Sequence, residues 1–311
     1  MSVKLFDTKE VQDFLKIACG LTYEGGNPRT KEIIHRIVSD LYKTIEDLNI
    51  TPDEFWAGIA YLNQLGQAQE AGLLSPGLGF DRYLDMRMDA EDEQLGIEGG
   101  TPRTIEGPLY VVGAPVEQGY ARLDDGSDKH GHTLIMHGTV YGADGQPIPN
   151  AKVEVWHCNT KGFYSHFDPT GEQKPFNMRR TIMADENGQY KFRSIVPSGY
   201  GCPPDGPTQQ LLNQLGRHGN RPAHIHFFVT ADDHRKLTTQ INIDGDPLVN
   251  DDFAYATREG LVPPLTEVTD PARIKEEGVE GPFAEITFDI HLTALVEGED
   301  NQIVERPRLV G

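Results

Sequence analysis

The spacing of apolar residues changes at residues 96–100, and this change limits what the chain can fold into. Before it, apolar side chains recur every three to four residues, for example from Ile33 to Leu48, which is typical of helices. After it, the period becomes two, and Gly, Pro, Asn and Asp separate short segments. We therefore expect a helical N-terminal region over residues 1–100 and a β domain over residues 101–311, an α+β fold that is mainly β.

Local signals place several elements. Thr51 is a predicted N-cap, Pro52 lies in the first turn, and the Glu54 side chain is expected to reach back to Thr51. A helix therefore begins here, and Gly72 is its expected end. The residues 185–188, Asp-Glu-Asn-Gly, predict a hairpin turn. The expected strands cover residues 133–141, 151–157, 179–184, 189–194, 221–229, 237–243 and 284–292. Short strands at this spacing favour a Greek-key-like β-sandwich.

The charge of the chain excludes some classes of partner. The 28 Lys and Arg residues against 48 Asp and Glu residues give a net charge of −20, which disfavours binding to nucleic acid or to anionic membranes. We expect no signal peptide and no membrane span, because no apolar run has the required length. The three cysteines Cys19, Cys158 and Cys202 lie far apart, which predicts reduced thiols and a cytoplasmic protein.

The stretch from Pro197 to His226 carries the most chemistry. On a strand after Pro222, His224 and His226 point to one face, and Ile225 points to the other. Two imidazoles on one strand can bind a metal, although most His-X-His pairs are ordinary surface or core residues. Tyr200 lies between two glycines in the long loop before this strand, and Tyr164 precedes it in the chain. Long loops inside compact domains are usually functional.

Taken together, these motifs resemble those of the intradiol ring-cleavage dioxygenases. Tyr164, the Pro-Ser-Gly-Tyr loop that ends at Tyr200, and the Arg-Pro-Ala-His-Ile-His strand from Arg221 to His226 occur in the family's order, and the resemblance spans nearly the whole chain. It implies that Tyr164, Tyr200, His224 and His226 bind one non-haem iron per subunit. Two phenolate donors favour Fe(III) over Fe(II). Tyr164 and His226 are expected in the equatorial plane with hydroxide, and Tyr200 and His224 as axial ligands.

The resemblance also implies a reaction. O2 is expected to open catechol between its two hydroxyl-bearing carbons, giving cis,cis-muconate in bacterial-type aromatic catabolism through the β-ketoadipate pathway. Catechol binds best as a dianion, so Tyr200 is expected to leave the iron and take one proton, with freedom from its flanking glycines. Arg221 is expected beside the ring, where its charge stabilises negative charge. Regular alternation would turn Arg221 away from the histidines, but Pro222 can break it; a surface salt bridge is the alternative.

The resemblance further implies a pocket for the ring. Gln240 is expected to partner Arg221. The other expected pocket residues are small or apolar: Leu73, Pro76, Ile105, Gly107, Pro108, Cys202, Phe253 and Ala254. Such a lining suits an unsubstituted ring and offers no charge for the carboxylate of protocatechuate. Each of these residues could equally belong to an ordinary core.

The apolar stripes of the N-terminal helices have two interpretations. They form either an internal core or a subunit interface, because a small helical layer seldom buries all its apolar faces. The resemblance favours a homodimer joined through these helices, which in similar enzymes can hold a lipid between the subunits.

Alternatives remain at this point. One is an Fe(II) enzyme of another class, a second is a β-sandwich binding module without chemistry, and a third is a sister enzyme acting on hydroxyquinol or chlorocatechol. His130 and His132 form a second His-X-His pair, but a glycine separates them, which favours a solvated turn. Structural roles are expected for the unpaired histidines His137, His157, His166, His218, His234 and His291.

Overall fold

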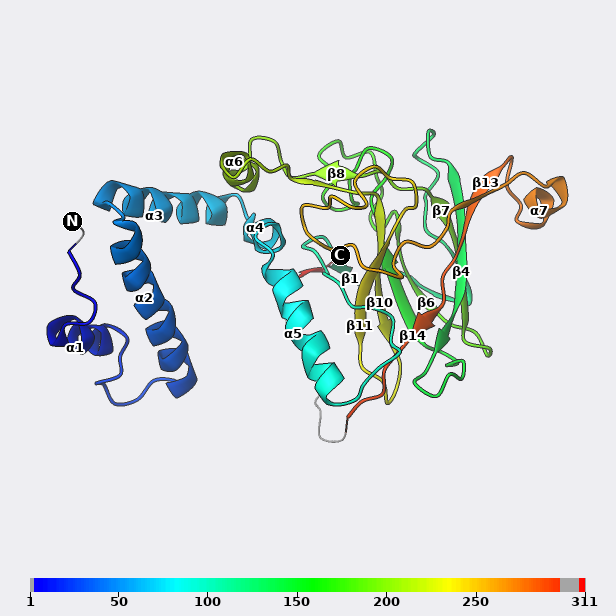
Figure 1. Ribbon diagram of the computed structural model, residues 1–311. Coiled ribbons are helices and arrows are strands. Elements are labelled where there is room, and N and C mark those ends of the chain that lie inside the picture. The colour runs from blue at the N-terminus through cyan, green and yellow to red at the C-terminus, as the bar shows by residue number, and fades with distance from the viewer. Residues whose placement is uncertain (1–2, 297–307, 311) are drawn as a thin grey trace. The chain divides into compact units, whose positions relative to one another are not determined.

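The computed structural model describes residues 3–296 and 308–310 (Figure 1). The chain divides into two compact units, Met1–Ala68 and Gln69–Gly311, and each is considered by itself. The helices before the first strand end with α5 at Gln94, and the strands begin with β1 at Val111. The change of apolar spacing near residue 100 therefore falls between the last of these helices and the first strand.

The first unit contains three helices, α1 (Lys9–Ala18), α2 (Pro28–Leu48) and α3 (Pro52–Gln67). The start of α3 has the predicted capping box, because Thr51 accepts from the backbone of Glu54 and the Glu54 side chain accepts from the backbone of Thr51. The predicted end of this helix was wrong. It ends at Gln67, and Gln69 has a left-handed φ of 57°, so Gly72 lies in the next helix.

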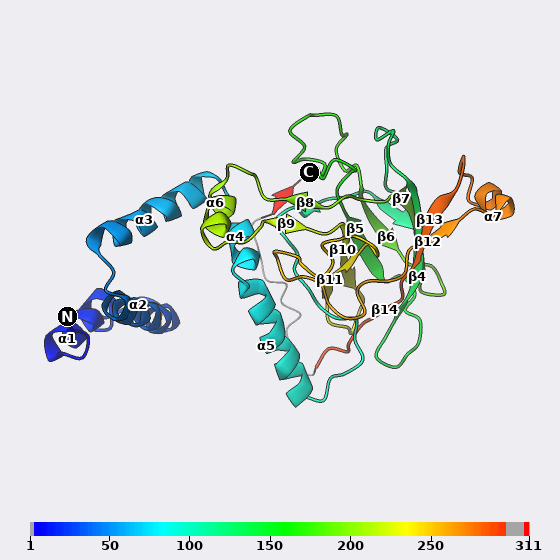
Figure 2. The same cartoon turned by 45° about the horizontal axis from the view of Figure 1, so that its top comes forward.

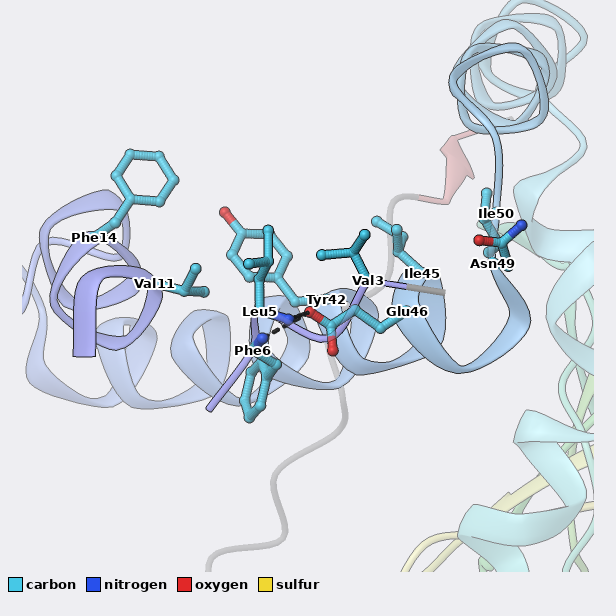
Figure 3. Close-up of a pocket in the computed structure, with 10 residues that line it drawn as sticks. All are labelled: Val3, Leu5, Phe6, Val11, Phe14, Tyr42, Ile45, Glu46, Asn49 and Ile50. Carbon is cyan, nitrogen blue, oxygen red and sulfur yellow. Dashed lines mark hydrogen bonds between the residues drawn. The ribbon is translucent and has the colours of Figure 1, made fainter. Parts of the chain in front are cut away.

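The chain before α1 packs across α2. Glu46 accepts hydrogen bonds of 2.6 Å from the backbone N–H of Leu5 and 2.6 Å from that of Phe6, as Figure 3 shows. Between these segments lies a largely apolar pocket of about 500 Å³. Its lining consists of Val3, Leu5, Phe6, Val11, Phe14, Tyr42, Ile45, Glu46, Asn49 and Ile50 (Figure 3).

The described residues of the second unit, 69–296 and 308–310, form four helices and the strands of the β domain. The helices are α4 (Ala71–Gly77), α5 (Phe80–Gln94), α6 (Pro207–Gln214) and α7 (Pro271–Glu276). The strands are β1 (Val111–Val112), β2 (Val116–Gln118), β3 (Tyr120–Arg122), β4 (Thr133–Tyr141), β5 (Lys152–Trp156), β6 (Arg179–Met183), β7 (Gln189–Ile195), β8 (Tyr200–Gly201), β9 (Asn220–Arg221), β10 (His224–Thr230), β11 (Leu237–Asn242), β12 (Thr266–Val268), β13 (Phe283–Thr287), β14 (Ile290–His291) and β15 (Leu309–Val310).

Two sheets pack face to face, which confirms the predicted β-sandwich. One has five strands in the order β11-β10-β5-β6-β2, and the other has six, in the order β12-β13-β4-β7-β3 with β14 paired to β4. The main core lies between them, where alternate residues of β10, such as Phe227, meet residues of β4 and β7, such as Phe192. In Figures 1 and 2, α4, α5 and α6 lie on the outer side of the five-stranded sheet.

Two predicted strands are interrupted. In the one expected over residues 221–229, β9 ends at Arg221 and β10 begins at His224. The segment expected over residues 284–292 forms β13 and β14, with Phe288 and Asp289 between them. Here the Phe288 carbonyl approaches β4 so closely that a Cβ built on Gly138 would lie 1.8 Å from its oxygen. The Asp289 side chain meanwhile accepts a hydrogen bond from the Thr139 N–H, in place of a backbone partner. The apolar alternation of the sequence does not reveal this interruption.

A helix that crosses a bilayer must be both long and apolar. None of those described combines the length with the apolar character that a membrane span needs.

Candidate metal centre

His224 and His226 lie on the outer face of the five-stranded sheet, because β10 alternates its side chains. Ile225 and Phe227 point the other way, into the core between the sheets. The two imidazole rings therefore come together, with centroids 4.7 Å apart and planes at 88°. The strand register also places Trp156 of β5 opposite His226, and its ring stacks on the imidazole at 4.9 Å.

Two tyrosines reach the same place from separate segments. Tyr164 follows β5, in a loop that the Asn159 side chain fixes by accepting hydrogen bonds from two backbone N–H groups. Tyr200 lies on β8, which pairs with β9. The hydroxyl oxygens of Tyr164 and Tyr200 lie 3.3 Å and 3.4 Å from Nε2 of His224. Three potential ligand atoms from three segments thus meet at one point.

The protonation of His224 suits a ligand. Its Nδ1 lies 2.6 Å from the Pro222 carbonyl oxygen, which can only accept, so Nδ1 carries the proton. The lone pair of Nε2 is then directed at the tyrosines. Nδ1 of His226 is buried and has no hydrogen-bond partner among the described residues. Beside its Nε2 lies Gly107, where a Cβ would stand 3.8 Å from this nitrogen.

Burial controls the ionisation of the four side chains. Desolvation, with the nearby charge of Arg221, lowers the pKa of His224 to about 3, and desolvation lowers the pKa of His226 well below its usual value. Burial raises the pKa of Tyr164 strongly and that of Tyr200 as well, although Arg221 opposes the latter effect. The imidazoles are therefore neutral donors, and the phenols gain from a cation that stabilises their anions. This donor set fits a metal ion.

The ligand set depends on its tyrosines. Within residues 3–296 and 308–310, no group of three or more His, Cys, Asp or Glu side chains is arranged to hold a metal ion. Half of the donors described above are phenol oxygens, so this set differs from a site built of His, Cys, Asp and Glu alone.

Gly199 and Gly201, which flank Tyr200, serve close packing. The backbone freedom that these glycines are expected to give Tyr200 stays a prediction, and the structure shows a packing role in addition. A Cβ on Gly199 would lie 2.6 Å from the Arg221 carbonyl oxygen, and one on Gly201 would lie 2.5 Å from the Asn220 side-chain oxygen. The glycines let β8 approach β9 and hold Tyr200 in register opposite Arg221.

Arg221 is buried, and its guanidinium reaches the histidines. NH1 lies 3.1 Å from Nε2 of His224, and NH2 donates to the Gln240 side-chain oxygen at 2.8 Å. Nε and NH2 donate to the two carboxylate oxygens of Asp252, each at 3.1 Å. Arg221 belongs to β9, whose ladder is separate from that of β10, and Pro222 follows it, so the alternation of β10 does not govern its direction. The ion pair is buried and is not a surface salt bridge.

Several expected pocket residues meet in a second buried apolar cluster. Its predicted members are Ile105, Cys202, Phe253, Ala254 and, packed against it, Leu73. Pro108 lies against Gly72, where a Cβ would be 3.3 Å from its side chain, and Pro76 is buried in α4. Gln240 is the register partner of His226 on β11. Leu212 and Ala256 also belong to the cluster, and the sequence analysis did not include them.

Two residues around the site were not expected from the sequence: Asp252, which holds Arg221, and Trp156, which stacks on His226. His157, for which a structural role was expected, is fully buried, with hydrogen bonds of 2.7 Å to the Cys158 carbonyl and 2.7 Å to the Ser194 hydroxyl. Alternation could have placed Trp156, because it lies in the strand predicted over residues 151–157. No sequence pattern links Asp252 to Arg221, since 31 residues separate them.

The remaining histidines lie elsewhere. His130 and His132 are not buried, and His132 pairs with Glu267 at 2.8 Å, so this second His-X-His pair does not join the site. Other contacts include His166 accepting from the Phe176 N–H and His218 lying 3.1 Å from Asp251.

Two phenols, two imidazoles and a buried guanidinium on the outer face of a β-sandwich define a candidate non-haem metalloenzyme. Comparison with known proteins identifies its family. The family model described as "Dioxygenase" matches residues 105–294, and the one described as "Catechol dioxygenase N terminus" matches residues 27–96. The chain belongs to the intradiol ring-cleavage dioxygenases, which confirms the resemblance inferred from its motifs.

Individual relatives are similar over the full length. A catechol 1,2-dioxygenase of Acinetobacter baylyi is 75% identical over 309 residues, which is 99% of each chain. The crystal structure of catechol 1,2-dioxygenase from Acinetobacter sp. ADP1, inhibited by bound mercury, is 74% identical with a TM-score of 0.97 and covers 99% of this chain and 100% of that one. A hydroxyquinol 1,2-dioxygenase of Rhizobium is 33% identical over 272 residues, or 86% of this chain and 90% of the relative.

The burial of His157 predicts how stability depends on pH. Desolvation lowers the pKa of its imidazole from 6.5 to about 4, whereas the unfolded chain binds the proton near the ordinary value. The unfolded state is therefore favoured as the pH falls from about 6.5 towards 4, by about 3 kcal/mol at most. His157→Gln should show a shallower loss of unfolding free energy over this range in denaturant titrations. His130→Gln, at an exposed position, is the control, and parallel curves for wild type and His157→Gln would contradict this assignment.

Proposed function

We propose that this chain is an enzyme with catechol 1,2-dioxygenase activity, which cleaves catechol with O2 between the hydroxyl-bearing carbons to give cis,cis-muconate. The observation that carries the proposal is the convergence of the Tyr164 and Tyr200 hydroxyls on Nε2 of His224, beside the buried Arg221. The chain that holds this geometry is 75% identical to a catechol 1,2-dioxygenase. Relatives that are hydroxyquinol dioxygenases are much more distant, so catechol is the favoured substrate.

The proposed cofactor is one non-haem Fe(III), held by Tyr164, Tyr200, His224 and His226. When bound, the ferric ion supplies a Lewis acid that takes catechol as a chelating dianion and makes its ring reactive toward O2. The protein contributes two phenolates, whose hard oxygen donors favour a trivalent ion. The proton on Nδ1 of His224, donated to the Pro222 carbonyl, fixes the ring so that Nε2 faces the iron position.

Tyr200 is the proposed base for the second catechol proton. Its phenol is buried, and burial raises its pKa, so a Tyr200 phenolate released from a metal would readily take a proton. Arg221 lies opposite Tyr200 in the β8–β9 register and can receive the released side chain. If anaerobic catechol binding left the absorption of both tyrosinates unchanged, this role for Tyr200 would be wrong.

Arg221 is proposed to stabilise negative charge on the bound ring. Asp252 and Gln240 engage its Nε and NH2, which leaves NH1 on the side of the histidines. The apolar cluster with Ile105, Phe253 and Ala254 would exclude water and so strengthen this charge interaction. Its residues offer no cation for a ring carboxylate.

We further propose that residues 1–100 form a dimerisation region and that the assembly is a homodimer. Exposed apolar side chains in the described helices, such as Phe14, Ile37 and Trp56, support an interface. The apolar pocket of Figure 3, between the N-terminal segment, α1 and α2, supports a possible lipid ligand. Organic extraction of the purified protein that yields no lipid would contradict that part.

A cytoplasmic location completes the proposal. The three cysteines are free thiols, and all are buried, as expected in a reducing compartment. Recovery of the protein from an oxidising compartment in cell fractionation would contradict it.

The activity itself is tested by O2 uptake. Purified protein loaded with iron should consume O2 with catechol, form cis,cis-muconate and show a red visible band from tyrosinate bound to Fe(III). Hydroxyquinol, chlorocatechols and protocatechuate should react more slowly. Faster turnover of hydroxyquinol would favour the sister activity, and a colourless protein without O2 uptake would contradict the proposed centre.

Arg221→Ala should bind iron and keep the visible band, because Arg221 is not a ligand. Its rate with catechol should fall by two to three decades, which corresponds to the loss of about 3 kcal/mol of charge stabilisation. Arg221→Lys, which keeps the charge without the planar guanidinium, is the control. Its rate with catechol should lie between those of the wild type and Arg221→Ala. Loss of iron in Arg221→Ala would make Arg221 structural, and a normal rate would remove its proposed charge role.

The homodimer predicts a sedimentation result. At micromolar concentration the protein should sediment at twice the mass of its 34.6 kDa chain. Trp56→Glu, which places a charge at an exposed apolar position of α3, should weaken the association. A wild-type monomer at this concentration would show that the dimer proposal is wrong.

A further inference from the structure

Asp252 is a buried carboxylate whose hydrogen bonds all go to protein groups that shape the site. Its side chain is 1% exposed and faces that of Arg221, which is 4% exposed. One oxygen accepts from Nε of Arg221 at 3.1 Å and from the Ala254 N–H at 3.0 Å. The other accepts from NH2 of Arg221 at 3.1 Å and from the Ala256 N–H at 3.3 Å. A single side chain thus holds both the guanidinium and the backbone of the apolar cluster.

A second path ties the same guanidinium to the same loop. NH2 of Arg221 donates to Gln240, whose amide nitrogen donates to Asn242 at 2.7 Å. Asn242 donates to the Thr257 hydroxyl at 2.6 Å, and that hydroxyl donates to the Val249 carbonyl. Residues 249–257 are therefore attached to Arg221 both through Asp252 and through Gln240.

This arrangement fixes the direction of the free edge of the guanidinium. A two-point contact between a carboxylate and the Nε–NH2 edge sets the plane of the group as well as its position. With that edge occupied, only NH1 lies toward the metal ligands, 3.1 Å from Nε2 of His224. Burial alone would raise the pKa of Asp252, but the charge of Arg221 together with the hydrogen bonds from Arg221 and the Ala254 N–H lowers it, which agrees with an ionised carboxylate.

We infer that Asp252 is a positioning residue for the ring-cleavage reaction: it aims NH1 of Arg221 at the catechol position. This inference rests on the proposed function. Asp252 contacts neither the metal ligands nor the ring position by itself and acts through Arg221.

The test is a double-mutant cycle on the iron-loaded enzyme. Asp252→Asn keeps the size of the side chain but removes its charge and one of its acceptors. We expect it to keep iron and the tyrosinate band, with kcat for catechol lowered about 10- to 100-fold. If Asp252 acts through Arg221, the double variant Asp252→Asn, Arg221→Ala should be no slower than Arg221→Ala alone. If the fold-loss of kcat in the double variant equals the product of the losses in Asp252→Asn and Arg221→Ala, the inference is wrong.

A matched control separates positioning from general stability. Glu277→Gln removes a carboxylate whose side chain is 9% exposed and which pairs with Lys191 of the six-stranded sheet at 2.7 Å. It should lower thermal stability without changing kcat, both in the wild-type background and in Arg221→Ala. Anaerobic titration with catechol, followed by the visible spectrum, should also show altered binding in Asp252→Asn and unaltered binding in Glu277→Gln.

Each further outcome is decisive. Asp252→Glu, which moves the carboxylate by one methylene, is the second variant and should also slow turnover. If neither Asp252 variant folds with iron, Asp252 is structural and the inference is wrong. A wild-type enzyme that does not turn over catechol would instead overturn the proposed function, so the two failures are distinguishable.

Discussion

The site depends on the burial of β10 on both of its faces. One face supplies Ile225 and Phe227 to the core between the sheets, and the other presents His224 and His226 beside the stacked Trp156. A shift of one residue in the register would move the histidines into the core and the apolar residues to the site. The free energy of forming the core therefore also fixes the position of the histidines, which gives the proposed metal ligands a rigid support.

Beside this strand, a shorter ladder carries two further side chains of the site. Tyr200 and Arg221 face each other across β8 and β9, which contain two residues each and approach closely because glycines flank Tyr200. The hydrogen bonds from Arg221 to Asp252 and Gln240 then connect this ladder to β11 and to the loop that lines the pocket. The pair of histidines is thus combined with a tyrosine that the β8–β9 ladder places and an arginine that side-chain hydrogen bonds orient.

Electrostatics explain why two phenols, two imidazoles and the Arg221–Asp252 ion pair lie together. Buried phenols are poor acids, and buried imidazoles are poor bases, so the four side chains are neutral until a cation joins them. Arg221 is a permanent cation in the same region, but Asp252 balances its charge. The pair therefore brings an oriented donor to the proposed ring position, and the proposed metal ion would not meet a full unbalanced charge.

The sequence by itself determined the fold class, most strand positions and the four proposed ligands. Period-two alternation is a local property, so β4 could be placed at residues 133–141 and the two histidines on one face. Long-range packing decided the rest. The interruption at Phe288 follows from the approach of its carbonyl to Gly138, and the direction of Arg221 follows from its own ladder and from Asp252. Such contacts join residues far apart in the chain, so only the tertiary structure brings them together.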